Sequence, residues 1–273
     1  MTKTGAESLK KAILNDFPRL TKEDSFKFRC GTGVPCFNAC CADVNIALTP
    51  YDVLRMKNRL AISSGDFLDR YTVIPFSSEQ QFPVVLLRMN DDERKSCQFV
   101  TQQGCSIYRD RPWACRMYPI GVASPADDDQ EKFFFVMQEE VCQGHGNEKT
   151  WTIGSWIQDQ GVTPYDELGE EFKEIALNEF FLKGHTLKPA QMEMLVMVLY
   201  DLDKFRRFVF ESSFLDRFEV EDEVVKVIRD NDVELLRLGF RWLKFSLFGQ
   251  KTIKIKEAAA RQAVNSQAGG TSS

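Results

Sequence analysis

The sequence predicts an α+β protein, built from a turn-rich cysteine-cluster module with a small β-element and a mainly helical region after it. All eight cysteines lie between Cys30 and Cys142, in a stretch where glycine and proline are frequent. After that stretch the apolar residues recur at helical spacing. We therefore predict a cysteine-cluster domain over residues 1–150, a helical region over 151–250 and a disordered tail over 251–273.

Three short elements are expected in the first part of the chain. Thr49-Pro50 provides a helix N-cap followed by proline at the first helical position, so a helix should run to about Leu60. The apolar runs 83–89 and 133–137 are bounded by polar residues, which is typical of short buried strands.

Three long helices are expected in the second part, over Leu168–Leu182, Lys188–Ser212 and Glu221–Phe248. In the last of them, apolar residues recur mainly at intervals of three, four and seven. We expect this apolar face to pack as core rather than to bind a partner.

The net charge and the lengths of the apolar runs indicate which classes of function are not expected. The net charge of −5 and pI near 5.3 give no overall basic bias, so nucleic-acid binding is not expected. The first residues lack the apolar core of a signal peptide, and Met192–Tyr200 is about half of the roughly 20 residues that cross a bilayer. We therefore expect a cytoplasmic protein without membrane contact, in which cysteines stay reduced and serve metal binding or catalysis.

The cysteines follow a spacing that matches no simple metal motif. The first group is Cys30-x5-Cys36-x3-Cys40-Cys41, and the others are Cys97, Cys105, Cys115 and Cys142. Thiolates suit zinc, copper(I) and iron–sulfur centres, but the paired C-x2-C spacing of zinc ribbons and the spacing of ferredoxins are absent. Because adjacent side chains diverge, Cys40 and Cys41 could ligate different irons, serve two sites or leave one thiol free.

The segment from Cys97 to Pro119, with Cys105, Cys115 and the preceding Cys-x3-Cys-Cys, resembles the YkgJ-type cysteine-cluster family of zinc- or iron-chelating domains. Flagellin lysine N-methylases resemble this family in the cysteine region. The resemblance implies metal ligation by six matching thiols, with two further cysteines as additional ligands: Cys36, Cys40, Cys41, Cys97, Cys105 and Cys115, then Cys30 and Cys142.

We therefore predict a metal-binding protein whose cysteines hold an iron–sulfur cluster, with zinc as the alternative cofactor and the physiological role open. The alternative function is an iron–sulfur-dependent redox or protein-modifying enzyme, such as a protein lysine N-methylase. The expected partner is the metal ion or cluster, and a protein partner is left open.

Residues beside the thiols are expected to support such a centre. Arg111 and Arg116 could compensate the negative charge of a multi-thiolate centre and donate hydrogen bonds to sulfur. His145 follows Cys142 closely enough to be considered as a ligand, but eight cysteines already suffice for two four-ligand sites. No phosphate-binding loop, zinc-protease motif or serine-hydrolase motif occurs, so no catalytic residue is assigned.

Overall fold

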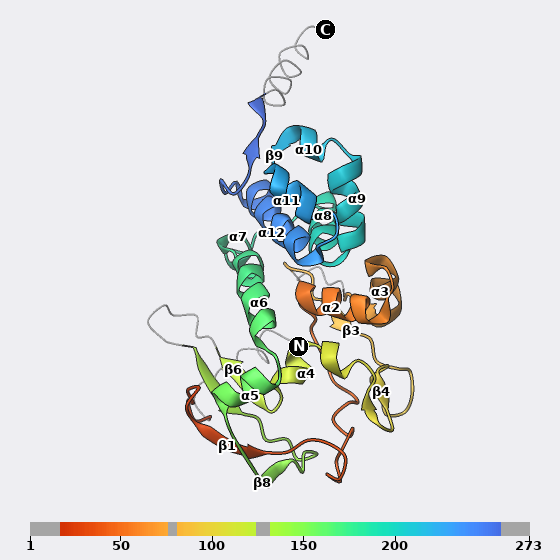
Figure 1. Ribbon diagram of the computed structural model, residues 1–273, viewed down its shortest axis with the longest axis vertical. Helices are drawn as coiled ribbons and strands as arrows, with labels where there is room; N and C mark the ends of the chain where they lie inside the picture. The colour runs from red at the N-terminus through yellow and green to blue at the C-terminus, as the bar shows by residue number, and fades with distance from the viewer. Residues whose placement is uncertain (1–16, 76–80, 124–131, 258–273) are drawn as a thin grey trace. The chain divides into compact units, whose positions relative to one another are not determined.

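The computed structural model describes residues 17–75, 81–123 and 132–257 (Figure 1). The chain divides into two compact units, each made from two chain segments. The first unit combines Met1–Ile46 with Met89–Asp166, and the second combines Ala47–Arg88 with Glu167–Ser273. Strands predominate early and helices later, which confirms the α+β class. Of the predicted tail, residues 258–273 lie outside the described residues.

The first unit is built on short antiparallel pairs. Strand β1 (Ser25–Phe28) pairs with β8 (His145–Thr152), and β6 (Ile120–Ala123) pairs with β7 (Phe133–Val136). The predicted strand over residues 133–137 is thus confirmed as β7. Between these pairs lie the hairpin β4 (Val100–Thr101) and β5 (Gly104–Cys105), the short helix η1 (Tyr108–Asp110), and α4 (Trp113–Met117); α5 (Ile153–Asp159) follows β8.

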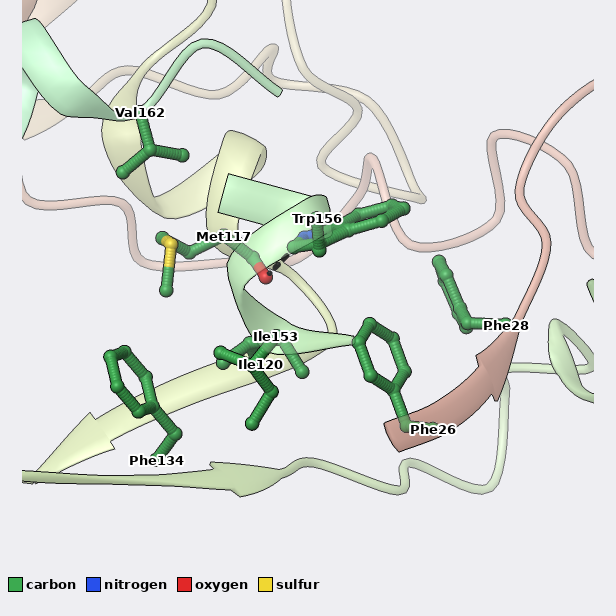
Figure 2. Close-up of a cluster of buried hydrophobic side chains, with 8 residues drawn as sticks. All are labelled: Phe26, Phe28, Met117, Ile120, Phe134, Ile153, Trp156 and Val162. Carbon is green, nitrogen blue, oxygen red and sulfur yellow. Dashed lines mark hydrogen bonds between the residues drawn. The ribbon is translucent and has the colours of Figure 1, made fainter. Parts of the chain in front are cut away.

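A buried apolar cluster holds these elements together (Figure 2). Phe26 and Phe28 are buried on one face of β1 while Ser25 and Lys27 are exposed, the alternation expected of a half-buried strand. Trp156 of α5 packs among them, and its Nε1 donates a hydrogen bond to the Met117 carbonyl at 3.2 Å. The full set is Phe26, Phe28, Met117, Ile120, Phe134, Ile153, Trp156 and Val162.

The second unit begins with the expected helix. Thr49 caps α2 (Pro50–Leu60) with a capping box, in which its hydroxyl accepts from the Asp52 N–H and the Asp52 carboxylate accepts from the Thr49 N–H. Helix α3 (Ser64–Tyr71) follows, and β2 (Thr72–Val73) pairs with β3 (Leu86–Leu87). The strand predicted over residues 83–89 is therefore real but shorter.

Each of the three long helices expected from periodicity is interrupted. A short polar side chain caps a new helix in each case: Asn178, Asp201 and Asn231 accept hydrogen bonds from backbone N–H groups two or three residues ahead. The observed helices are α6 (Thr163–Ala176), α7 (Glu179–Leu182), α8 (Pro189–Tyr200), α9 (Leu202–Glu211), α11 (Asp222–Val227) and α12 (Asp232–Phe248). The prediction of three continuous helices was wrong, because the spacing of apolar residues continues past a capping residue and therefore does not reveal where one helix ends and the next begins.

The last helix packs as expected. Leu235, Leu236 and Leu243 of α12 are fully buried, and α12 contacts α8 and α9 within the second unit. The unit also contains α10 (Phe214–Arg217) and the pair β9 (Phe218–Glu219) and β10 (Lys254–Ile255). Within the part of the chain that the structure describes, no helix combines the length and apolarity needed to span a bilayer.

Candidate metal centre

The first four cysteines lie on a loop of successive tight turns after β1. The Phe37 N–H donates to the Val34 carbonyl at 2.9 Å, and the Cys41 N–H donates to the Asn38 carbonyl at 3.2 Å. Gly33 has a φ of 96° and Asn38 a φ of 68°, a left-handed backbone that glycine and asparagine tolerate best. The glycine-rich sequence therefore wraps the backbone so that several thiols face the same neighbourhood.

Four cysteines, here called the pocket group, line one pocket with an empty volume of about 310 Å³, including space open to solvent. They are Cys30, Cys36, Cys40 and Cys142. Cys30 is close enough to the other three for their charges to interact. The Gln143 N–H donates to the Cys36 Sγ at 3.1 Å. Apolar side chains, including Phe28, Phe37 and Val34, complete the wall.

The pairing of β1 with β8 explains how Cys142 joins thiols that are more than 100 residues earlier. Phe28 is in register with His145, and the Arg29 N–H donates to the Gly144 carbonyl at 3.0 Å. The two strands therefore place the residues after β1 beside those before β8. Cys142 therefore joins the pocket group through this strand pairing and not through local sequence.

The other four cysteines, here called the hairpin group, gather around the β4–β5 hairpin and α4. They are Cys41, Cys97, Cys105 and Cys115. Charge interactions link Cys41 to Cys97 and to Cys115, and link Cys97 to Cys105. The Cys97 N–H donates to the Cys41 carbonyl at 2.8 Å, which ties the first loop to the hairpin.

Cys40 and Cys41 connect the two groups, because they are adjacent in the chain and each belongs to a different group. The interaction between their thiols lowers the pKa of Cys40 to about 7 and raises the pKa of Cys41. Burial raises the pKa of Cys30, Cys97 and Cys105. A metal that binds these thiols must therefore displace protons, which makes its affinity depend on pH.

The chemistry of the donor set fits a thiophilic metal. None of the eight cysteines forms a disulfide, and seven of them are half-buried while Cys30 is exposed. Two sets of four thiols match the tetrahedral four-cysteine environment of structural zinc and the four ligands of iron–sulfur clusters. Among residues 17–75, 81–123 and 132–257, no three histidine, cysteine or carboxylate side chains are already close enough to form a coordination sphere. The thiols of each group must therefore move inward to bind.

The two predicted supporting arginines are buried in the same unit, with exposed fractions of 7% for Arg111 and 6% for Arg116. Arg111 is close enough to Cys105 and Cys115 for their charges to interact. Arg109, in contrast, is exposed, and only its backbone carbonyl takes part, as acceptor from Arg116. The fold therefore buries both arginines that the sequence singled out, and their role beside a metal centre stays a prediction.

His145 is next to the pocket group but is not part of the pocket wall. Its ring packs against Phe28 at 5.2 Å, and burial lowers its pKa although a hydrogen bond with the Met137 backbone opposes this. The structure adds Tyr118, which the sequence analysis did not single out. Tyr118 lines the pocket, and burial together with the neighbouring Cys142 raises its pKa. Its position directly after α4, three residues from Cys115, is the only sequence signal for it.

Eight clustered thiols in a small turn-rich fold are the donor chemistry of a metal-binding class of protein. Residues 29–143 match the model of the CxxCxxCC family, described as a "Putative zinc- or iron-chelating domain". This match confirms the resemblance seen in the sequence, and metal binding is the activity that the family description supports. This chain departs from the family name in spacing, with five residues between Cys30 and Cys36. No curated protein and no solved structure matches the chain.

Proposed function

We propose that this protein binds metal through all eight cysteines, as two sites of four thiolates, and that its physiological occupant is an iron–sulfur cluster. The observation that carries the proposal is the sorting of the thiols into a pocket group and a hairpin group of equal size. When bound, an iron–sulfur cluster would supply one-electron redox chemistry. The apolar side chains of Phe28, Phe37 and Val34 in the pocket wall would tune the redox potential of such a cluster.

The experiment is metal analysis of the protein purified without oxygen. A brown preparation that absorbs at about 400 nm and contains iron with acid-labile sulfide would support an iron–sulfur cluster as the occupant. A colourless protein with stoichiometric zinc supports two-site metal binding but replaces the cluster by zinc. A preparation with neither transition metal nor sulfide, which also fails to take up Zn²⁺ or Fe²⁺ in vitro, refutes the proposal.

Matched variants separate the two sites. Cys142→Ser removes one thiol of the pocket group, and Cys115→Ser removes one thiol of the hairpin group. Each variant should retain about half of the wild-type metal, since the groups share no ligand. Loss of all metal in both variants would show that the eight thiols serve one centre. Protein-modifying chemistry such as lysine methylation, a protein partner and a cytoplasmic location remain predictions from the sequence.

A further inference from the structure

Two buried guanidinium groups lie side by side in the first unit, and all their hydrogen-bond acceptors are neutral. Arg111 donates through Nη1 to the Tyr108 carbonyl at 2.5 Å and through Nη2 to the Gln160 side-chain oxygen. Arg116 donates through Nε to the Arg111 carbonyl at 2.9 Å and through Nη1 to the Gln160 carbonyl at 2.7 Å. Its Nη2 donates to the Arg109 carbonyl. Most nitrogen atoms of the two guanidinium groups therefore have a hydrogen-bond acceptor, but none of these acceptors carries a negative charge.

Aromatic rings cover the two guanidinium groups without supplying a counter-charge. Arg111 lies 3.8 Å from the ring centroid of Tyr108, and Arg116 lies 4.4 Å from that of Tyr165. Such stacking favours a cation by a modest amount. In the part of the chain that the structure describes, neither arginine forms an ion pair with a carboxylate. The nearest carboxylate link is indirect, through Gln160, whose Nε2 donates to Asp159 at 2.7 Å.

Two buried like charges without an anion are costly, because burial removes water and the charges repel each other. Burial lowers the pKa of Arg111, and the positive charge of Arg116 lowers it further. The groups that oppose this by becoming anionic are Tyr108, Cys115 and Cys105. Two of these three are thiols of the hairpin group. Negative charge on the hairpin group would therefore stabilise Arg111, and Arg116 directly follows a thiol of the same group, Cys115, in α4.

A four-thiolate centre supplies that charge in the required amount. Zinc held by four thiolates carries two net negative charges, and so does an oxidised iron–sulfur cluster held by four thiolates. The two arginines carry two positive charges. The hairpin group filled with metal and the arginine pair would thus neutralise each other in a half-buried environment, where charge interactions are screened less than at the surface.

The pocket group has weaker support, since the charge of Arg111 acts on one of its thiols, Cys30, and on two thiols of the hairpin group, Cys105 and Cys115. Its pocket is open to solvent, Cys30 is exposed, and the one arginine in its wall, Arg29, is an exposed residue. An exposed cation contributes little to the stability of a nearby anion, because water and salt screen it. A metal in the pocket group is also within reach of competing ligands. The two groups of thiols therefore differ in charge compensation and in access.

We propose that the hairpin group is a tight metal site, with Arg111 and Arg116 as its built-in counterions, and that the pocket group is the exchangeable site through which metal enters and leaves. This inference rests on the proposed two-site metal binding. Cys40 and Cys41, which are adjacent in the chain and belong to different groups, give metal a direct path from one site to the other.

The first test uses the wild-type protein loaded with Zn²⁺ under anaerobic conditions. EDTA is added, zinc release is followed with time, and free thiols are alkylated with N-ethylmaleimide and identified by mass spectrometry. The expected result is a fast first equivalent that leaves Cys30, Cys36 and Cys142 labelled, and a second equivalent released at least tenfold more slowly. Labelling of Cys97, Cys105 and Cys115 first, or of all cysteines together, would overturn the proposal. Failure of the wild type to bind zinc would instead contradict the proposed function itself.

The second test separates charge from hydrogen-bond geometry. Arg111→Lys keeps the charge but loses the planar fork, whereas Arg111→Gln loses the charge. The loss of one nearby unit charge is worth roughly tenfold to hundredfold in affinity at an effective dielectric constant of about 20. We expect Arg111→Gln to weaken the slow zinc site by this factor, and Arg111→Lys to weaken it only a few-fold.

The matched control is Arg109→Gln, which removes an exposed charge two residues away while leaving the backbone carbonyl that Arg116 uses. Its slow site should be unchanged, and in the two Arg111 variants the fast site should weaken less than the slow one, because Arg111 interacts with one pocket thiol, Cys30, and with two hairpin thiols, Cys105 and Cys115. Equal weakening by lysine and glutamine would mean that Arg111 acts through hydrogen bonds alone, which contradicts the counterion role. If Arg111→Gln does not fold, the order of thiol labelling in the wild type and the affinity of Arg111→Lys still decide the outcome.

Discussion

Lys57 should be one of the most sensitive polar positions of the second unit, because it joins the two chain segments that form this unit. The Lys57 side chain, on α2, is only 7% exposed. Its Nζ lies 3.3 Å from the Asp203 carboxylate of α9 and 3.2 Å from the Asp232 carboxylate at the start of α12. Lys57→Met would keep most of the apolar stem and remove the charge.

The expected cost follows from the geometry. At about 3 Å and an effective dielectric constant of about 20, each ion pair contributes roughly 5 kcal/mol of Coulomb attraction before desolvation is subtracted. Removing one partner of a fully buried pair typically costs about 3–5 kcal/mol. Asp203 is 29% exposed and Asp232 keeps a second ion pair with Arg206, so we expect Lys57→Met to lower the free energy of unfolding by about 2–3 kcal/mol.

The assay is equilibrium urea unfolding at pH 7, compared with that of Lys183→Met. Lys183 forms an exposed ion pair with Glu179 in the same unit, and its loss should leave the unfolding midpoint unchanged. If Lys57→Met and Lys183→Met have the same midpoint, Lys57 does not hold the two chain segments together and the reasoning is refuted.

The same ion pair predicts a pH dependence. Burial alone would raise the pKa of Asp203, but hydrogen bonds from Ser64 and the charge of Lys57 outweigh it, so the pKa lies below its ordinary value of 3.8. A depressed carboxylate pKa stabilises the fold fully above 3.8 and loses this contribution as the pH falls through the folded value. Below about pH 4, wild-type stability should therefore fall more steeply than that of Lys57→Met.

Three further predictions concern packing and the thiols. Gly239→Ala should destabilise the protein by about 1–3 kcal/mol, because the added Cβ would lie 2.7 Å from a side chain of α8; the control Gly169→Ala, with no atom within 4 Å, should instead stabilise α6 slightly in thermal unfolding. Ile153→Ala should lower the free energy of unfolding by about 2–5 kcal/mol, since this side chain is fully buried in the apolar cluster of Figure 2, and an effect below about 1 kcal/mol would contradict that burial. Cys40→Ser should abolish the fast zinc equivalent and Cys41→Ser the slow one in EDTA release, and loss of the same equivalent by both would disprove the division of the thiols.

Some features could be predicted because they depend on residues that are close in sequence. The capping box of α2 needs only Thr49 and Asp52, and the strand β7 needs only a short apolar run between polar residues. The class of metal ligand likewise follows from residue type, since clustered thiols favour thiophilic metals wherever they meet. The cysteine family could be recognised for the same reason, because its pattern is contained in residues 29–143.

Helix length was overestimated where apolar periodicity continues across a polar cap. Asn178, Asp201 and Asn231 each end one expected helix and begin another. Whether such a residue faces solvent within a helix or caps a new one depends on whether the chain must turn to bury the next apolar face. Local propensity does not contain that information.

The sequence by itself determined the α+β class, the helix start at Thr49 and the presence of eight thiols suited to a soft metal. Only the tertiary structure decided that Cys142 joins Cys30, that Cys40 and Cys41 belong to different groups, and that residues 47–88 pack with the C-terminal helices. The physical reason is that turns and caps are set by contacts over a few residues. The meeting of distant thiols is set instead by strand pairing and core packing, which depend on the whole chain.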